Sequence, residues 1–270
     1  MLPLKDNIPT DRFPVVTVVI IVLNVIMFFG FQHAEWAPGG GFAVDNQNTI
    51  EYAEIPYEIT HPGENCGVIG DVDDPGAKIV CGEPADLDRA GADPGGDQPS
   101  SWLTLLTSMF MHGGLLHIAG NMLFLWIFGN NVEDSMGPVK FVAFYLLGGL
   151  AASAAQIGFS PNEPVPTLGA SGAVAAVLGA YALLYPRARV VTLVFIIIFI
   201  TVIELPAALV LFGWAVLQVL SASSEAAVGG GGGGVAYWAH IGGFAFGLAL
   251  IKLFATKQKE DRVQPRLPVY

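Results

Sequence analysis

Hydrophobic residues fill six long runs of this chain, at about 13–32, 114–131, 139–159, 170–186, 190–221 and 236–255. A helix of roughly 20 apolar residues spans the hydrocarbon core of a bilayer. The run 190–221 is too long for one span and is interrupted by Glu204-Leu205-Pro206. Proline disfavours helix continuation, and a carboxylate is costly at mid-membrane. We therefore expect an interfacial or partly inserted segment at 190–203 and a span at 206–221. The pattern predicts an all-α membrane protein with a six-transmembrane-helix bundle.

A long polar segment separates the first apolar run from the second. It holds 14 of the 23 acidic residues, between Glu35 and Asp97, and it is rich in Gly and Pro. The rest of the chain is so apolar that only 13% of all residues are charged, about half of what a soluble domain carries. The net charge of −11 argues against nucleic acid as a partner,.

The basic residues predict the orientation in the membrane. With the N-terminus in the cytoplasm, ten of the twelve Lys and Arg residues lie inside, and only Lys78 and Arg89 lie outside, in the acidic segment. This is the distribution that the positive-inside rule describes. A seventh span at 190–203 would move the basic C-terminal residues outside, so the rule favours six. The ten inner residues are Lys5, Arg12, Lys140, Arg187, Arg189, Lys252, Lys257, Lys259, Arg262 and Arg266.

These patterns divide the chain into five parts and predict a multi-pass protein of the cell membrane with both termini in the cytoplasm. The N-terminal part has no signal-peptide cleavage pattern, so the first apolar run should be retained. The parts are a cytoplasmic N-terminus (1–12), a first transmembrane helix (13–33), an acidic extracytoplasmic loop (34–100), a core of five helices (101–256) and a cytoplasmic tail (257–270).

The acidic loop contains both cysteines of the chain, Cys66 and Cys81. An oxidising compartment favours a disulfide between them, closing a short loop. Two free thiols in the loop are the alternative.

Polar residues inside the apolar runs need an explanation, because the membrane makes them costly. Three such sites occur: His112 to Asn121 in the second helix, Gly169-Ala170-Ser171-Gly172 in the fourth, and Ala239-His240-Ile241-Gly242-Gly243 in the last. In the orientation predicted from charge, all three lie at a similar shallow depth near the outer face. This convergence indicates one shared site.

Residue spacing indicates how the three sites meet. His117 and Asn121 are four apart and share one helix face. Small residues follow Ser171 at Ala175 and Gly179, and Gly243 and Gly247 repeat four apart below His240. Such stripes let membrane helices pack closely.

If the two stripes pack together, Ser171 lies beside His240, a base able to take the hydroxyl proton of a serine nucleophile. His117, Asn121 and the N–H groups at the start of the fourth helix are then candidate donors to an oxyanion. The carboxylates Glu133, Asp134 and Glu204 are predicted at the opposite face, so the pattern predicts a Ser-His dyad without an acidic third member.

At these residues the chain resembles the rhomboid family of intramembrane serine proteases. Gly169-x-Ser171-Gly172 is similar to the nucleophile motif, and the segment from Ala239 to Gly247, with Gly243 and Gly247, is similar to the last-helix motif that carries the basic histidine, here His240. His117 and Asn121 resemble the family's oxyanion-stabilising pair. His112 matches a further histidine of the second helix, and Glu133 matches an acidic residue at its cytoplasmic end.

The resemblance implies peptide-bond hydrolysis in or near transmembrane segments of other membrane proteins, by a six-helix fold with an outward-facing cavity. Its implied partners are transmembrane substrates and the lipid bilayer. It also implies a gate at the fifth helix, which is followed by the glycines 229–234. No cofactor motif is present, and the two cysteines do not suit a metal site.

The chain departs from the family at two positions. Trp102 is followed by Leu103 where family members often have Trp-Arg, and Ala175 stands where some members stack a tyrosine on the base. The second departure predicts a looser ring of His240.

Other interpretations of the same residues stay open at this point. His112 suits loop bracing, and His117 with Asn121 suits hydrogen bonding between helices. An inactive relative that binds membrane helices is one alternative function, although this chain keeps both dyad residues. A transporter or proton relay is another, but it would place such residues near the midplane with a carboxylate partner.

Overall fold

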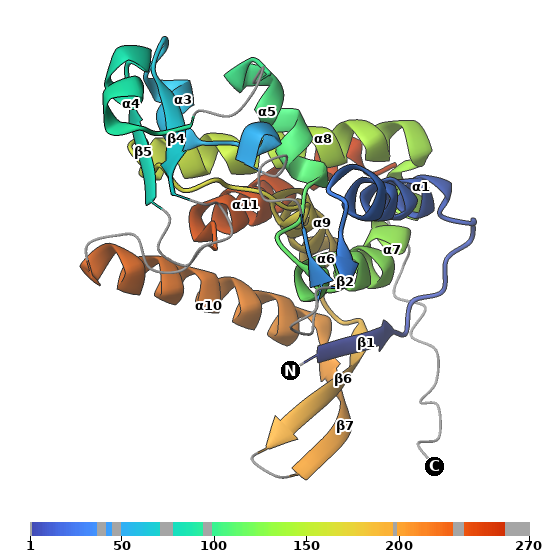
Figure 1. Ribbon diagram of the computed structural model, residues 1–270. Helices are drawn as coiled ribbons and strands as arrows, with labels where there is room; N and C mark the ends of the chain where they lie inside the picture. Colours follow the sequence, from blue (N-terminus) through green and yellow to red (C-terminus); the bar gives the residue numbers. More distant parts are fainter. Residues whose placement is uncertain are drawn as a thin grey trace.

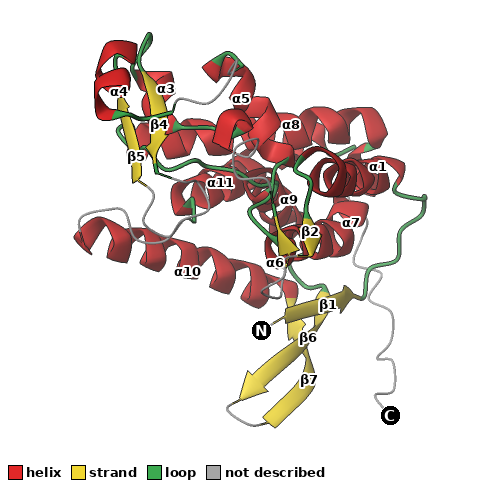
Figure 2. Ribbon diagram, viewed as in Figure 1, coloured by secondary structure: helices red, strands yellow, loops and turns green. Residues whose placement is uncertain are grey.

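Helices form the body of the protein, and three small sheets lie at its edges (Figures 1 and 2). The computed structural model describes residues 2–36, 42–44, 50–70, 78–93, 99–196, 199–228 and 235–256. The glycines 229–234, which follow the predicted gate, lie outside these residues.

Five of the six apolar runs form helices over nearly their whole length, and the run 190–221 forms one only in its second half. Four helical segments among the described residues are long and apolar enough to cross a membrane: Leu115–Met136, Pro138–Phe159, Ala207–Ser224 and Tyr237–Phe254. Shorter apolar helices cover Val15–Phe31 and Ser171–Leu184. The chain is therefore a multi-pass membrane protein. In order, the helices are α1 (Val15–Ile26) with η1 (Met27–Phe31), α6 (Leu115–Phe124) with η3 (Leu125–Gly129) and α7 (Asn130–Met136), α8 (Pro138–Phe159), α9 (Ser171–Leu184), α10 (Ala207–Val228) and α11 (Tyr237–Phe254).

The all-α prediction is wrong for the first half of the run 190–221. There the chain forms an antiparallel hairpin of β6 (Arg189–Ile196) and β7 (Phe199–Pro206), and β1 (Leu2–Asp6) pairs with β6. The hairpin projects from the helical body at the end where α10 begins (Figure 1). Its sequence is rich in Val, Ile, Thr and Phe, which suit a pleated strand better than a helix. Pro206, the break seen in the sequence, ends β7 directly before α10.

The N-terminal strand is tied to the helices through a buried carboxylate. Asp6 accepts hydrogen bonds from the Tyr181 hydroxyl at 2.6 Å and from Asn131 Nδ2 at 2.7 Å. Burial raises the pKa of Asp6 to about 6, against the lowering effect of these two bonds,. Asp6 thus attaches the sheet of β1, β6 and β7 to α7 and α9. The attachment lies at the end of the sheet where β7 passes into α10.

Glu133 of α7 has a structural role in this fold. Its carboxylate accepts the backbone N–H groups of Val16 and Thr17, at 3.0 and 2.8 Å, and also the Thr17 hydroxyl. These N–H groups belong to the first turn of α1, where a helix has no internal acceptors for them. Glu133 therefore caps α1 and joins it to α7.

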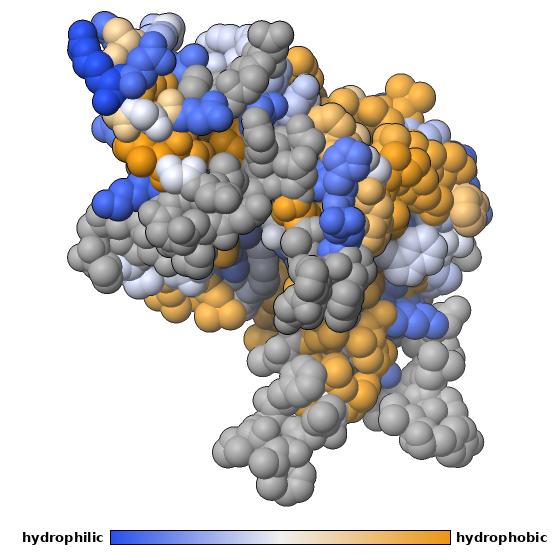
Figure 3. Space-filling view, in the orientation of Figure 1, coloured by the Kyte–Doolittle hydropathy of each residue, from blue (hydrophilic) through white to orange (hydrophobic). Residues whose placement is uncertain are grey.

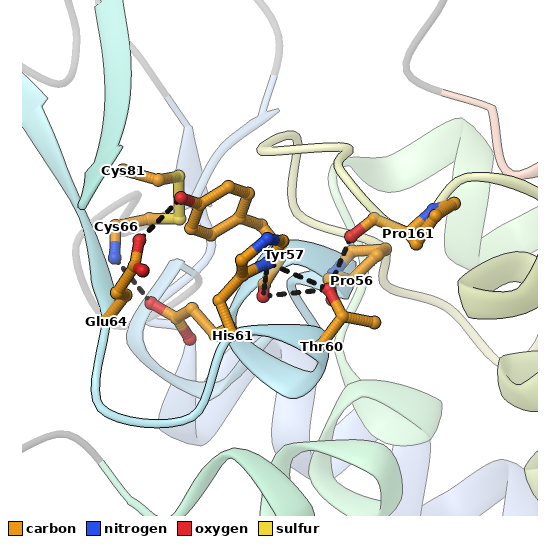
Figure 4. The surroundings of a disulfide bond; sticks show 9 residues. Pro56, Tyr57, Thr60, His61, Glu64, Cys66, Cys81 and Pro161 are labelled. Atoms are coloured by element: carbon orange, nitrogen blue, oxygen red, sulfur yellow. Dashed lines mark hydrogen bonds between the residues drawn. A yellow bond between two sulfur atoms is a disulfide. The ribbon is translucent and has the colours of Figure 1, made fainter.

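The chain between η1 and α6, here called the first loop, is a small structured unit with a disulfide. It contains β2 (Glu35–Trp36), β3 (Phe42–Ala43), α3 (Pro56–Thr60), β4 (Asn65–Ile69), β5 (Lys78–Gly82), α4 (Pro84–Ala90), α5 (Ser101–Thr107) and η2 (Ser108–Phe110). Cys66 and Cys81 face each other across β4 and β5 and are bonded in the structure (Figure 4). Hydrophilic side chains gather over α4, whereas hydrophobic side chains cover the region of α1 (Figure 3).

α9 lies at the centre of the helical body. All its residues from Gly172 to Ala182 are buried, and α8 and α11 pack against it. A helix that is apolar on every side is typical of such an enclosed position. Ser171, its first residue, is therefore held by helices on several sides.

Candidate active site

The structure brings Ser171 and His240 together. Ser171 is the first residue of α9, and His240 lies in the first turn of α11. The distance between Ser171 Oγ and His240 Nε2 is 2.9 Å, within hydrogen-bond range,. The motifs of the fourth and last apolar runs thus meet at one point.

Glycines set the distance between α9 and α11. A Cβ atom on Gly243 would collide with the carbonyl oxygen of Gly172, and one on Gly247 would collide with that of Ala176. Gly179 meets the Phe244 backbone in the same way. Only glycine allows two helix backbones to approach this closely. The packing of these glycines keeps the two helices close enough for Ser171 and His240 to touch.

Position 169 requires glycine for two reasons, its backbone conformation and the closeness of the His117 ring. Its φ angle is 126°, in the region that favours glycine,. A Cβ at this position would lie 2.7 Å from His117 Nε2. Its N–H donates to the Ser108 carbonyl at 2.9 Å. The turn before Ser171 is therefore pressed against the ring of His117.

His117 and Asn121 of α6 line the same cavity as the dyad. His117 Nδ1 accepts the Gly113 N–H at 3.4 Å, which leaves Nε2 as the N–H donor of the neutral ring. Asn121 is 9% exposed, and its Nδ2 has no hydrogen-bond partner in the described structure. Both side chains thus lie at the wall of the cavity that Ser171 also lines.

The cavity has a volume of about 230 Å³. Besides the four residues named above, α8 and the first loop contribute Ser153 and Glu54 to its wall. It also reaches Val235 and Ala236, the residues just before α11.

Two residues of α10 hold the ring of His240, and the sequence analysis missed both. Gln218 Oε1 lies 2.8 Å from His240 Nδ1. The ring of Trp214, one turn earlier, lies 5.7 Å from the imidazole ring. The departure at Ala175 predicted a looser ring; in the structure α10 contacts the ring, and Ala175 itself is fully buried near Gly243. The sequence did contain a signal for this contact, because the indole of Trp214 and the amide of Gln218 lie four residues apart in an apolar span.

Glu54 is a further residue that the sequence analysis did not assign. Its side chain is 1% exposed, and Oε2 accepts a hydrogen bond from Ser153 Oγ at 2.5 Å. Burial raises the pKa of this carboxyl to about 7, although the hydrogen bond from Ser153 lowers it,. The backbone of Glu54 pairs with Thr167 through bonds of 3.1 and 2.6 Å, which places a carboxylate of the first loop at the cavity.

His112 contacts the site only through His117. Its ring packs edge-on against that of His117 at 5.2 Å and is fully buried. Gln32 clamps the backbone of His112 with two hydrogen bonds, of 2.8 and 2.9 Å. The contacts of His112 are those of a residue that braces the loop before α6.

The disulfide lies in the first loop, between β4 and β5. Beside it, Glu58 accepts the N–H of Cys66 at 2.8 Å, and the Thr60 hydroxyl donates to the Pro161 carbonyl at 2.6 Å (Figure 4). Pro161 belongs to the segment between α8 and α9. Trp102 of α5, at the first departure from the family, is 69% exposed. The first loop is thus joined through Thr60 to the segment between α8 and α9, which leads to Ser171.

The arrangement has the parts that acyl transfer needs. If His240 Nδ1 carries the proton and donates to Gln218, then Nε2 is free to accept the Ser171 proton. His117 Nε2, Asn121 Nδ2 and the N–H groups at the start of α9 are donors for a developing oxyanion. The site therefore holds candidates for a nucleophile, an oriented base and oxyanion donors.

The sequence of the chain is similar to those of several known proteins. A family model described as the rhomboid domain matches residues 99–257. Rhomboid protein 1, mitochondrial, of Saccharomyces cerevisiae is 29% identical over 175 residues, which are 63% of this chain and 47% of that protein. Rhomboid protease GluP of Bacillus subtilis is 43% identical over 79 residues, 29% of this chain and 15% of that protein.

A human protein is also similar to this chain. Presenilin-associated rhomboid-like protein, mitochondrial, is 31% identical over 146 residues, which are 53% of this chain and 36% of that protein. The chain spans less than half the length of each of these three relatives.

Proposed function

The chain belongs to the rhomboid family, and we propose that it is a serine endopeptidase that cleaves membrane proteins in or next to their transmembrane segments. The observation that carries this proposal is the 2.9 Å contact between Ser171 Oγ and His240 Nε2. The direct test is cleavage of a transmembrane test substrate by the purified protein in liposomes. The wild-type protein should release a product that the Ser171→Ala protein does not.

In the proposed reaction, Ser171 Oγ attacks the carbonyl carbon of the scissile peptide bond while His240 Nε2 takes the hydroxyl proton. His240 then gives this proton to the leaving amine, and the C–N bond breaks. Water reaches the acyl-enzyme through the cavity and loses a proton to His240 as it attacks. The second product carries the new carboxylate, and Ser171 regains its proton. The reaction needs only a peptide bond and water.

Gln218 acts as a positioning residue in this mechanism. Its amide oxygen accepts a hydrogen bond from the N–H group at Nδ1 of His240. This bond keeps the proton on Nδ1 and directs the lone pair of Nε2 toward Ser171. Because Gln218 lies on α10, the helix proposed as the gate, the same helix that admits substrate orients the base. The outward side chains of α10, such as Leu209, Val216 and Leu217, are exposed among the described residues, which suits a helix that moves against lipid or substrate.

Gln218→Leu should lower kcat by roughly five- to tenfold, the effect of losing one neutral hydrogen bond, and leave KM nearly unchanged. Gln218→Glu keeps an acceptor for the Nδ1 proton and should retain more activity than Gln218→Leu. Steady-state kinetics in detergent micelles measures both. Leu217→Ala, on the exposed face of α10, is the control. Equal kcat for Gln218→Leu and Leu217→Ala would show that Gln218 does not orient the base.

We further propose that α1 with η1, α6 through α7, α8, α9, α10 and α11 form six spans. Both chain ends then lie at the side rich in Lys and Arg, and Ser171 opens to the opposite side. The hairpin of β6 and β7 stays at the inner end of α10 and does not cross. This proposal is supported by the charge distribution and by the common end at which Ser171 and His240 lie.

Cysteine labelling in intact cells tests this topology. In a chain in which Cys66 and Cys81 are replaced by serine, Pro62→Cys should react with an impermeant thiol reagent from outside. Lys5→Cys should react only after the membrane is opened, and both positions are exposed in the structure. Reaction of Lys5→Cys from outside, or protection of Pro62→Cys, would contradict the proposed orientation.

A further inference from the structure

Most of the first loop lies outside the part of the chain that matches the rhomboid domain, since the match begins at residue 99. The stretch 50–70 of this loop nevertheless contacts the segment 160–170, which joins α8 to α9. Residues 167–169, near the end of that segment, line the active-site cavity together with Ser171. A part of the chain outside the family domain thus contacts the segment that leads to the nucleophile.

Three contacts with the first loop hold this segment along its length. Thr60 Oγ1 donates to the Pro161 carbonyl at 2.6 Å (Figure 4). The N–H of Tyr57 donates to the Glu163 carbonyl at 3.2 Å. The backbone pairing at Thr167, described above, is the third contact. Because the three acceptors and donors are spread from the start of the segment to its end, α3 and the residues before it fix the path of the backbone toward α9.

α3 is itself held by the hairpin of β4 and β5. Glu58 of α3 is buried and accepts the N–H of Cys66 at 2.8 Å. A two-stranded hairpin is marginally stable in water, and among the described residues this one is extended only by a bridge between Val68 and Asp93. Its bond to Cys81 spans 15 residues and restricts the unfolded hairpin. The disulfide therefore stabilises the support of α3.

We propose that α3, β4 and β5, here called the disulfide unit, position the turn before Ser171, and that the oxidation state of Cys66 and Cys81 thereby sets turnover. A dithiol reduces the bond to two cysteine thiols and is itself oxidised to a disulfide, so two electrons and two protons pass to the protein. Cys81 is half-buried, which gives a small dithiol access to the bond.

The expected effect of reduction follows from the chain of contacts. The hairpin loosens, α3 loses its support, and the backbone before the nucleophile becomes less well ordered. Small displacements of a reacting group lower the rate of the chemical step. This inference rests on the proposed protease function and adds a regulation of it.

The test compares cleavage of one transmembrane substrate in liposomes before and after treatment with dithiothreitol. Reduction should lower kcat by roughly fivefold, about the effect of losing one neutral hydrogen bond, with KM nearly unchanged, and reoxidation should restore it. The double variant Cys66→Ser, Cys81→Ser should have the low kcat in both conditions. Amide hydrogen exchange should rise on reduction in peptides from 160–170 and stay unchanged in peptides from α11.

Two threonine variants test the positioning without changing the disulfide. Thr60→Val removes the hydroxyl that donates to Pro161 and should lower kcat by about threefold, whereas Thr60→Ser keeps a hydroxyl and should restore most of the wild-type rate,. Thr201→Val is the control, because Thr201 is exposed on β7, far from α3 in Figure 1. Equal kcat for Thr60→Val and Thr60→Ser would contradict the positioning role.

Labelling of Ser171 by a fluorophosphonate separates this inference from the proposed function, because it reports the nucleophile without a peptide substrate. If Ser171 is labelled and the oxidised and reduced enzymes cleave at equal rates, the redox-sensitive positioning is wrong and the protease function stands. If Ser171 is not labelled and no substrate is cleaved in either state, the proposed function itself fails. If reduction raises hydrogen exchange in every helix, the disulfide only stabilises the whole fold, which also overturns the inference.

Discussion

Ser171→Ala and His240→Ala are each expected to reduce cleavage of a transmembrane substrate by roughly 10⁴-fold or more. Alanine at 171 removes the only oxygen that lies within hydrogen-bond range of His240 Nε2 in the described structure. Alanine at 240 leaves the serine hydroxyl without a base, and an unassisted hydroxyl is a weak nucleophile. Because the two residues act as a unit, the double variant should be no slower than either single variant. Product formation in liposomes, followed by gel analysis, measures all three.

A matched variant controls for general effects of replacing a serine in a helix. Ser223 lies on an exposed face of α10 and bonds only to the Val219 carbonyl of its own helix. Ser223→Ala should keep wild-type activity, and thermal unfolding should show that all four variants fold. Activity within a few-fold of wild type in folded Ser171→Ala or His240→Ala protein would rule out the dyad.

Asn121→Ala should lower kcat by roughly a hundredfold with little change in KM, the usual result of losing one oxyanion donor. The buried Nδ2 of Asn121 has no partner among the described residues, so we expect it to bond to an oxyanion when one develops. An interaction made only in the transition state affects kcat and not ground-state binding. Single-turnover cleavage with saturating enzyme isolates the chemical step from product release.

Gly120→Ala is the control for Asn121→Ala, since a Cβ on Gly120 meets open space on the same helix. His117→Ala should also lower turnover, and it should loosen the turn at Gly169, which packs against the His117 ring. Full turnover in both Asn121→Ala and His117→Ala would indicate that the donors come from elsewhere. The pair would then serve as a polar contact between helices, as considered from the sequence.

The apolar runs show how much of the fold the local sequence pattern predicts. The apolar runs predicted helix positions to within a few residues. A segment that crosses a membrane must be apolar over its whole length, and as a helix it satisfies its backbone hydrogen bonds internally. The hairpin of β6 and β7 is where the same reasoning failed. Hydrophobicity alone does not separate a strand from a helix, and β1, which pairs with β6, comes from more than 180 residues earlier in the chain.

The sequence by itself determined that three polar motifs occur near one end of three apolar helices, and that small residues repeat every four residues in two of these helices. This much follows from local spacing, since a helix places such residues on one face. Only the tertiary structure decided which other residues join the site. Gln218 reaches the base because α10 lies beside α11, and Glu54 reaches the cavity because the first loop pairs with Thr167. Contacts between segments far apart in the chain depend on how the helices pack, and no periodicity within one segment records them.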